Sequence, residues 1–172
     1  TAFALTALDA AGVETAYPEK ALDFLVKTQT QEGHWGADWH YYGTPFYPLD
    51  PILETLCRSN GNGGLDAVIT RARRFILRAQ SADGAFGKHE SPDGNGVSAE
   101  LRTALALKAL LHCSAVEAEP AITRGIDWLL RRQREDGSWY GGTFPHPNPK
   151  IAKSENVFCT AEILILLHGR TK

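Results

Sequence analysis

The chain has 172 residues, of which 43% are apolar and 22% are charged, and its net charge is −2. This composition fits one ordinary globular core, and the near-balanced charge gives no electrostatic reason to expect nucleic acid as a partner. The longest apolar run, 163–167, is far too short to span a membrane. No basic stretch precedes an apolar core at the start, so no signal peptide is expected there. Because an apolar pattern is already under way at Thr1, we expect the natural beginning of the polypeptide to lie elsewhere.

The predicted helices are of two kinds that alternate along the chain. Segments 3–8, 52–56, 101–111 and 158–167 are almost continuously apolar, which is typical of helices buried on all sides. Segments 20–29, 71–80 and 124–133 have apolar residues at helical spacing and keep one polar side, so they are expected to face solvent. Alternation of buried and half-exposed helices predicts two concentric layers. The fold class is therefore all-α, an α/α toroid of helix-pair repeats comprising about half or more of a full ring.

The half-exposed helices belong to three segments that superimpose without a gap. They begin at the basic residues Lys20, Arg71 and Arg124 and recur at intervals typical of helical repeats. Proline- and glycine-rich boundaries divide a single domain, 1–172, into an inner helix at 1–16 and units at 17–64, 65–118 and 119–172. Each copy continues to a glutamine, then a glycine four residues later, then an aromatic residue two further on: Gln29, Gly33 and Trp35; Gln80, Gly84 and Phe86; Gln133, Gly137 and Trp139.

The glutamine, glycine and aromatic residue, which recur at the same spacing in all three segments, have a structural interpretation. A glutamine can bond free backbone groups at a helix end, and a glycine permits the tight turn that follows. The aromatic ring then packs over the turn and locks one outer helix to the next unit. We therefore assign a scaffold role, not a catalytic one, to six residues: Gln29, Trp35, Gln80, Phe86, Gln133 and Trp139.

The arrangement resembles the QW motif of the squalene–hopene and class II terpene cyclases, and related repeats occur in protein prenyltransferase β subunits. Ala21 and Ala72 replace the glycine of the motif, and Phe86 replaces its tryptophan. The resemblance covers nearly the whole chain and implies an α/α barrel around an apolar cavity for an isoprenoid substrate. In that family an Asp-x-Asp-Asp motif protonates the substrate, and aromatic faces stabilise the carbocations that follow.

The acid motif itself is absent from the chain as written. In the family it is commonly followed by Thr-Ala at the start of an inner helix. The four residues before Thr160-Ala161 are 156–159, and the four before Ser98-Ala99 are 94–97, and neither set contains an acid. The third such place is Thr1-Ala2, whose preceding residues lie off the chain. This suggests the C-terminal portion of a class II cyclase, beginning just after its acid motif.

Three carboxylates inside the chain are weaker catalytic candidates. Asp50 precedes Pro51, so it is either a helix N-cap or an acid; as a cap it would have a lowered pKa, which does not suit an acid. Glu100 and Glu162 follow Ser98-Ala99 and Thr160-Ala161 at matching positions on apolar helices. A carboxylate there either acts chemically or interacts with the helix dipole.

Aromatic residues supply the candidate substrate contacts. The segment 39–47 is the densest aromatic cluster, and it either lines a cavity mouth or packs on itself. With the inner-helix aromatics, the candidates are Phe3, Trp39, Tyr42, Phe46, Tyr47 and Phe158. A zinc site like that of the prenyltransferases is not expected, because Val157 stands where those proteins have an aspartate two residues before the cysteine that matches Cys159.

The three cysteines, Cys57, Cys113 and Cys159, lie in apolar runs and are odd in number. This favours buried thiols in a reducing compartment, hence a cytoplasmic location, over a disulfide framework.

The function these residues indicate is protonation-initiated cyclisation of an isoprenoid. The alternative is a non-catalytic QW-repeat scaffold or a subunit that completes a barrel. No cofactor is expected, apart from Mg²⁺ if the substrate is a diphosphate. Because half a toroid exposes apolar inner faces, the chain is expected to pack against another domain, another chain segment or a copy of itself.

Overall fold

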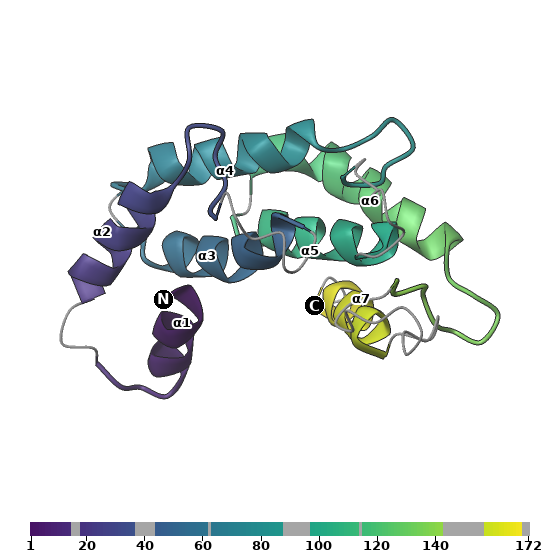
Figure 1. Cartoon of the computed structure of the whole chain (residues 1–172), viewed down its shortest axis with the longest axis horizontal. Coiled ribbons are helices and arrows are strands. Elements are labelled where there is room, and N and C mark those ends of the chain that lie inside the picture. The colour runs from purple at the N-terminus through teal and green to yellow at the C-terminus, as the bar shows by residue number, and fades with distance from the viewer. Residues whose placement is uncertain are drawn as a thin grey trace.

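The computed structural model describes residues 1–14, 18–36, 44–61, 63–87, 97–113, 115–142 and 157–169. These ranges are helical and contain no strand. They form two layers (Figure 1), an inner arc and an outer arc. The inner helices are α1 (Ala2–Ala10), α3 (Phe46–Arg58), α5 (Ala99–Leu111) and α7 (Val157–Gly169). The outer helices are α2 (Pro18–Thr28), α4 (Asp66–Arg78) and α6 (Glu119–Arg131), with the short 3₁₀ helix η2 (Val116–Ala118) before α6. The predicted all-α, two-layer architecture is confirmed.

The outer helices bury one stripe and expose the rest. In α4 the buried residues Val68, Ile69, Ala72 and Ile76 repeat at helical spacing, while Arg74 stays exposed. Each outer helix also has an acidic residue in its first turn and a basic residue in its last turn, which suits the helix dipole. The outer layer is therefore an amphipathic cover whose apolar stripe faces the inner arc.

The inner helix α5 is the centre of the core. Ser98 caps its start, because the Ser98 hydroxyl accepts the Leu101 N–H at 3.0 Å. From Glu100 to Leu107 every residue is buried. It packs against α3 on one side and α7 on the other, with α6 behind it. A helix covered on so many sides must be apolar nearly all round, as its sequence is.

Helix α3 begins earlier than the sequence suggested. It starts at Phe46, so Asp50 and Pro51 lie in its second turn and Asp50 is not an N-cap. Pro51 lies beyond the first four helical residues and has no N–H, so the helix loses one backbone hydrogen bond there. The helix nevertheless continues past Pro51, and the side chain of Asp50 is free to interact with neighbouring inner helices.

The QW segments join successive outer helices. In the first two copies the glutamine amide donates both to its own turn and to the first turn of the next outer helix. The aromatic ring is held by the helix that precedes it, since the indole N–H of Trp35 donates to the Leu25 carbonyl at 2.7 Å, and that of Trp139 to the Leu129 carbonyl at 2.8 Å. The glutamine bonds are Gln29 to the Gly33 and Val68 carbonyls at 3.2 and 2.9 Å, and Gln80 to the Gly84 and Ala121 carbonyls at 3.1 and 2.8 Å.

The glycine of the motif is required by close approach as well as by conformation. Gly33 and Gly84 have φ of +107° and +106°. A Cβ on Gly33 would lie 2.4 Å from the Arg71 carbonyl oxygen, and one on Gly84 would lie 2.5 Å from that of Arg124. A side chain at either position would clash with the backbone of the next outer helix, so the glycine sets how closely two repeats pack.

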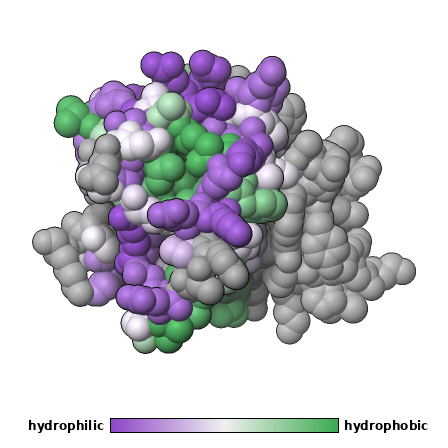
Figure 2. Space-filling view, turned by 90° about the vertical axis from the view of Figure 1, so that its left-hand side faces the viewer, coloured by the Kyte–Doolittle hydropathy of each residue, from purple (hydrophilic) through white to green (hydrophobic). Residues whose placement is uncertain are grey.

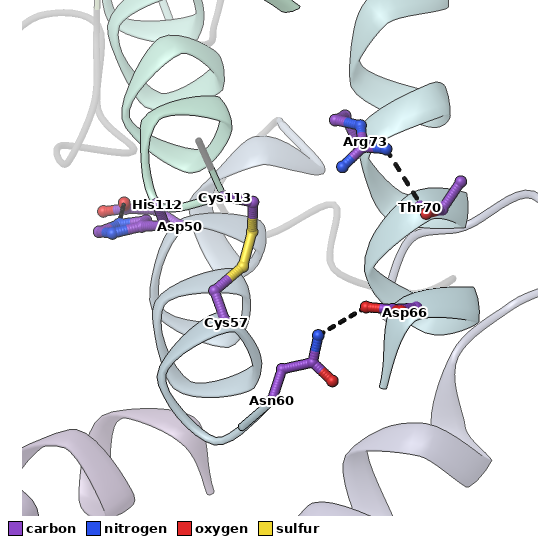
Figure 3. The surroundings of a disulfide bond; sticks show 8 residues. All are labelled: Asp50, Cys57, Asn60, Asp66, Thr70, Arg73, His112 and Cys113. Atoms are coloured by element: carbon purple, nitrogen blue, oxygen red, sulfur yellow. Dashed lines mark hydrogen bonds and ion pairs between the residues drawn. A yellow bond between two sulfur atoms is a disulfide. The ribbon is translucent and has the colours of Figure 1, made fainter. Parts of the chain in front are cut away.

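The cysteines depart from expectation. Cys57, at the end of α3, and Cys113, just after α5, form a disulfide with their Cα atoms 5.7 Å apart (Figure 3). Two residues far apart in sequence meet because α3 and α5 are adjacent inner helices, a relation that cysteine spacing alone does not reveal. Cys159 is a buried thiol that does not take part in the disulfide. The cysteines therefore give no argument for a reducing compartment.

Candidate functional site

The inner helices present a side that the outer layer does not cover, here called the concave face. On α3 the less buried residues Tyr47, Asp50 and Glu54 fall at helical spacing on one stripe. On α5 the partly exposed residue within the otherwise buried run is Lys108, and on α7 Glu162 is partly exposed. In a ring-shaped fold this face lines the interior, so it is the candidate functional site.

Four charged or ionisable side chains meet across three inner helices; we call them the inner-helix ion cluster. The Lys108 ammonium of α5 lies 2.9 Å from Asp50 Oδ2 of α3 and 2.7 Å from Glu162 Oε2 of α7. His112 Nε2, after α5, lies 2.8 Å from Asp50 Oδ1, and both side chains project from the same side of the inner helices (Figure 3). One lysine thus bridges two carboxylates that are far apart in sequence.

The cluster favours the charged forms of Asp50 and Lys108. Burial alone would raise the pKa of Asp50, but the hydrogen bond from His112 and the charge of Lys108 outweigh it, so the pKa lies below its usual value. Burial alone would lower the pKa of Lys108, but the Asp50 charge and the bond to Glu162 raise it. Asp50 is therefore a stable anion at neutral pH and is poorly suited to donate a proton.

Glu100 lies elsewhere. Its side chain is only 3% exposed, and its Oε1 accepts a bond from Arg132 Nε at 2.7 Å. Arg132 follows the outer helix α6 and also stacks over the Trp128 ring at 4.9 Å. Glu100 therefore joins the first turn of α5 to the outer layer. The three candidate carboxylates do not form one site.

The structure also revises the register of the inner helices. Thr103 Oγ1 accepts the backbone N–H of Phe86 at 3.0 Å, and Thr160 Oγ1 accepts the backbone N–H of Trp139 at 3.1 Å. Thr103 and Thr160 are therefore equivalent, which makes Thr103-Ala104 the counterpart of Thr160-Ala161. The sequence predicted that Glu100 and Glu162 occupy matching positions. The structure shows that this prediction was wrong. The missed signal was Thr103-Ala104 itself, which is visible in the sequence.

The aromatic candidates divide into separate groups. Phe3, 63% exposed at the start of α1, and Tyr47 at the start of α3 have ring centroids 6.4 Å apart, and both are accessible to a ligand. Phe158 is partly buried in the first turn of α7. Phe46 is only 1% exposed and packs on Phe75 and Phe86 between the layers, which corrects its assignment as a substrate contact. Trp39 and Tyr42 lie outside the described residues.

The described ranges contain no cluster of side chains that could bind a metal ion. No three His, Cys, Asp or Glu side chains there come together as ligands. Burial raises the pKa of the Cys159 thiol to about 12, so this cysteine is a thiol at neutral pH and a poor ligand.

An open cavity of about 780 Å³ lies at one end of the arc, between α1, α2 and the end of α3. Its wall mixes apolar and charged side chains: Leu5, Thr6, Asp9, Gly12, Val13, Glu14, Pro18, Leu22, Thr55, Arg58 and Ser59. Arg58 crosses it to Asp9 at 3.1 Å. The cavity is separate from the inner-helix ion cluster.

Comparison with known proteins identifies the family. Residues 1–149 match the squalene-hopene cyclase C-terminal domain, and the chain belongs to this family. It is 30% identical to the squalene–hopene cyclase of Zymomonas mobilis over 78% of its own length and 22% of that enzyme. It is 31% identical to the lanosterol synthase of Saccharomyces cerevisiae, over 69% of its length and 17% of that enzyme. The chain thus spans about a fifth of these relatives.

Solved structures agree on the fold. The type II terpene cyclase MstE from Scytonema, in complex with geranylgeranyl dihydroxybenzoate, superimposes with a TM-score of 0.64 at 24% identity, over 84% of this chain and 47% of that protein. This likeness supports the α/α-toroid architecture. No helix in the described ranges has the length and apolar character needed to cross a bilayer.

Proposed function

We propose that this chain forms part of a class II-type terpene cyclase and supplies one wall of the cavity in which an isoprenoid is cyclised. The family match over 1–149 carries the proposal, together with the two-layer arc that presents inner helices toward a common interior. The neighbouring cyclase holds a geranylgeranyl compound, and a linear isoprenoid is the substrate class we propose here.

The proton donor is proposed to lie outside the three internal candidates. Asp50 is held as an anion, Glu162 is bonded to Lys108, and Glu100 is bonded to Arg132. An acid for alkene protonation must instead carry its proton before the substrate arrives. By sequence, Thr1-Ala2 resembles Thr103-Ala104 and Thr160-Ala161, which the structure shows to be equivalent. We therefore propose that aspartates directly before Thr1 supply the acid.

The exposed aromatics are proposed to guide the cation. Phe3 and Tyr47 lie together at the start of two inner helices, next to the position proposed for the acid. A carbocation formed there would be attracted to their ring faces. Protonation of an alkene forms a carbon–hydrogen bond and a cation, and the reaction ends when the cation loses a proton or binds water. We propose that this chemistry needs no cofactor, apart from Mg²⁺ if the substrate is a diphosphate.

Incubation of the full-length polypeptide, which includes the residues before Thr1, with squalene, oxidosqualene and geranylgeranyl diphosphate (the last with Mg²⁺), followed by gas chromatography–mass spectrometry, tests the proposal. A cyclic product from one of them supports it. The variants Asp50→Asn, Glu100→Gln and Glu162→Gln should keep the activity for as long as they remain folded by circular dichroism. Loss of cyclisation in a folded Asp50→Asn or Glu162→Gln variant would place the acid inside the chain and contradict the assignment.

The alternative is a binding scaffold without catalysis, and one observation favours it: none of the three internal carboxylates is placed as a proton donor. Isothermal titration of the same full-length polypeptide with these isoprenoids separates the two. Binding without any turned-over product would identify a scaffold, whereas binding with turnover identifies a cyclase.

A further inference from the structure

Two links of different chemistry hold the end of α5 against α3. Cys113, just after α5, is bonded to Cys57 in the last turn of α3. His112, the residue before Cys113, lies 2.8 Å from the Asp50 carboxylate (Figure 3). Asp50 lies about 10 Å before Cys57 along α3. Adjacent residues of the chain therefore supply a covalent link and a hydrogen bond to the same neighbouring helix.

The end of α5 depends on these links because its own backbone holds it weakly. The helix ends at Leu111. The N–H of Cys113 donates to the Leu110 carbonyl at 3.4 Å, which is long for a backbone hydrogen bond. Helix ends fray when nothing else holds them. The disulfide is therefore placed to decide how firmly His112 is held against Asp50.

The paired cysteines are nearer to solvent than the third cysteine. Cys57 and Cys113 are both partly exposed, whereas Cys159 is fully buried. Burial also raises the pKa of the Cys159 thiol to about 12, so this residue is not a thiolate at neutral pH and reacts slowly in thiol–disulfide exchange. A small thiol or disulfide in solution therefore reacts with the pair and not with Cys159.

The two linked helices are central in the fold. They lie in the middle of the inner arc, between α1 and α7 (Figure 1). The end formed by α1 and α2 shows hydrophobic residues in the midst of a polar surface (Figure 2), and the polypeptide expected before Thr1 would join the chain there. The link between α3 and α5 does not involve that surface, so it does not depend on what covers either end of the arc.

We propose that the bond between Cys57 and Cys113 is a redox-controlled link that couples the thiol–disulfide state of the protein to the His112–Asp50 contact of the inner-helix ion cluster. For reduction, a glutathione thiolate attacks one protein sulfur, and a second glutathione displaces the first from the mixed disulfide. Glutathione disulfide leaves, and the two cysteines together gain two electrons and two protons. The end of α5 then frays and His112 separates from Asp50.

This change alters the concave face. In the oxidised protein Asp50 is bonded to both His112 and Lys108, and after reduction Lys108 is its remaining partner in the cluster. The coupling must be reciprocal, because a bond that strengthens a contact is itself strengthened by that contact. Loss of the His112–Asp50 contact should therefore make the disulfide easier to reduce.

The stability of the disulfide in glutathione buffers tests the proposal. The full-length polypeptide is equilibrated at a series of thiol-to-disulfide ratios, unbonded thiols are alkylated, and mass spectrometry gives the oxidised fraction of the pair. His112→Phe keeps an aromatic ring but cannot donate to Asp50, and it should lower the equilibrium constant for disulfide formation at least about threefold. His34→Phe is the matched control, since His34 also contacts a carboxylate, Glu32 at 3.4 Å, but on the first QW turn, and it should leave the constant unchanged.

Hydrogen exchange of the wild-type polypeptide needs no substitution. Reduction should speed the exchange of backbone amides in 108–113, at least about threefold, and should leave those of 68–76 in α4 unchanged. Circular dichroism shows whether the reduced protein and both variants remain folded. Absence of the disulfide at every glutathione ratio, equal constants for folded His112→Phe and His34→Phe, or the same exchange at 108–113 in both redox states would overturn the proposal.

Discussion

Replacement of Lys108 by methionine is the most informative single perturbation of the inner arc. Methionine keeps the length and the apolar stem of lysine but removes the charge that bridges Asp50 and Glu162. The side chains of Asp50 and Glu162 are each 16% exposed, and that of Lys108 is 20% exposed. The substitution therefore leaves two mostly buried carboxylates facing each other without their shared cation.

The magnitude follows from burial. Removing one partner of a buried ion pair costs about 3–5 kcal/mol, because the remaining charge stays desolvated. Since some water reaches this cluster and His112 still bonds Asp50, we expect about 3 kcal/mol, which for a domain of this size lowers Tm by about 6–12 °C. The matched control is Lys27→Met, which breaks an exposed pair with Asp23 and should cost at most about 0.5 kcal/mol.

Urea unfolding as a function of pH checks both the size and the cause. The folded-state pKa of Asp50 is lowered from 3.8, so its stabilisation is present above that value and is lost as pH falls through the lower folded value. The penalty of Lys108→Met should therefore be full near pH 7 and shrink in acid, as Asp50 takes up a proton. A penalty no larger than that of Lys27→Met, or one that does not change with pH, would refute the reasoning.

Three further predictions concern the scaffold. Cys113→Ser removes the disulfide between α3 and α5, whose two cysteines are separated by 56 residues in sequence. It should lower the free energy of unfolding, measured with urea in the absence of reductant, by about 2–4 kcal/mol. An equally large effect of the substitution in the presence of reductant would contradict this. Gly84→Ala should destabilise by at least about 2 kcal/mol more than Gly137→Ala in calorimetry, because both share the cost of positive φ but only Gly84 faces a backbone oxygen. Thr160→Val should cost about 1–2 kcal/mol through the lost acceptor for the Trp139 N–H, whereas Thr123→Val on the exposed side of α6 should change the unfolding midpoint little.

The repeat allowed the fold to be predicted from the sequence. Gln29, Gln80 and Gln133 recur with the same spacing to a glycine and an aromatic residue, and this periodicity reports a local structure that does not depend on distant contacts. The contrast between apolar and half-polar helices likewise reflects how many sides each one buries. Local pattern was therefore enough to assign seven helices to two layers.

The site depended on contacts that no local pattern encodes. The sequence predicted Asp50 as a possible helix N-cap because Pro51 follows it. In the structure α3 begins at Phe46, and Asp50 bonds Lys108 of the neighbouring helix. The bond between Cys57 and Cys113 likewise depends on the adjacency of α3 and α5. Phe46 was grouped with its aromatic neighbours, yet adjacent helix positions face different sides, so Phe46 is buried while Tyr47 is accessible.

The deuterium content of the product is the most direct test of the account. If the full-length polypeptide cyclises a linear isoprenoid by protonation, a reaction in D₂O should place one deuterium from solvent on the carbon that is protonated first, as mass spectrometry and NMR of the product would show. The same label should appear in the product of the folded Glu162→Gln variant. A cyclic product without solvent deuterium at that carbon, or binding of the isoprenoid with no product, would contradict protonation-initiated cyclisation.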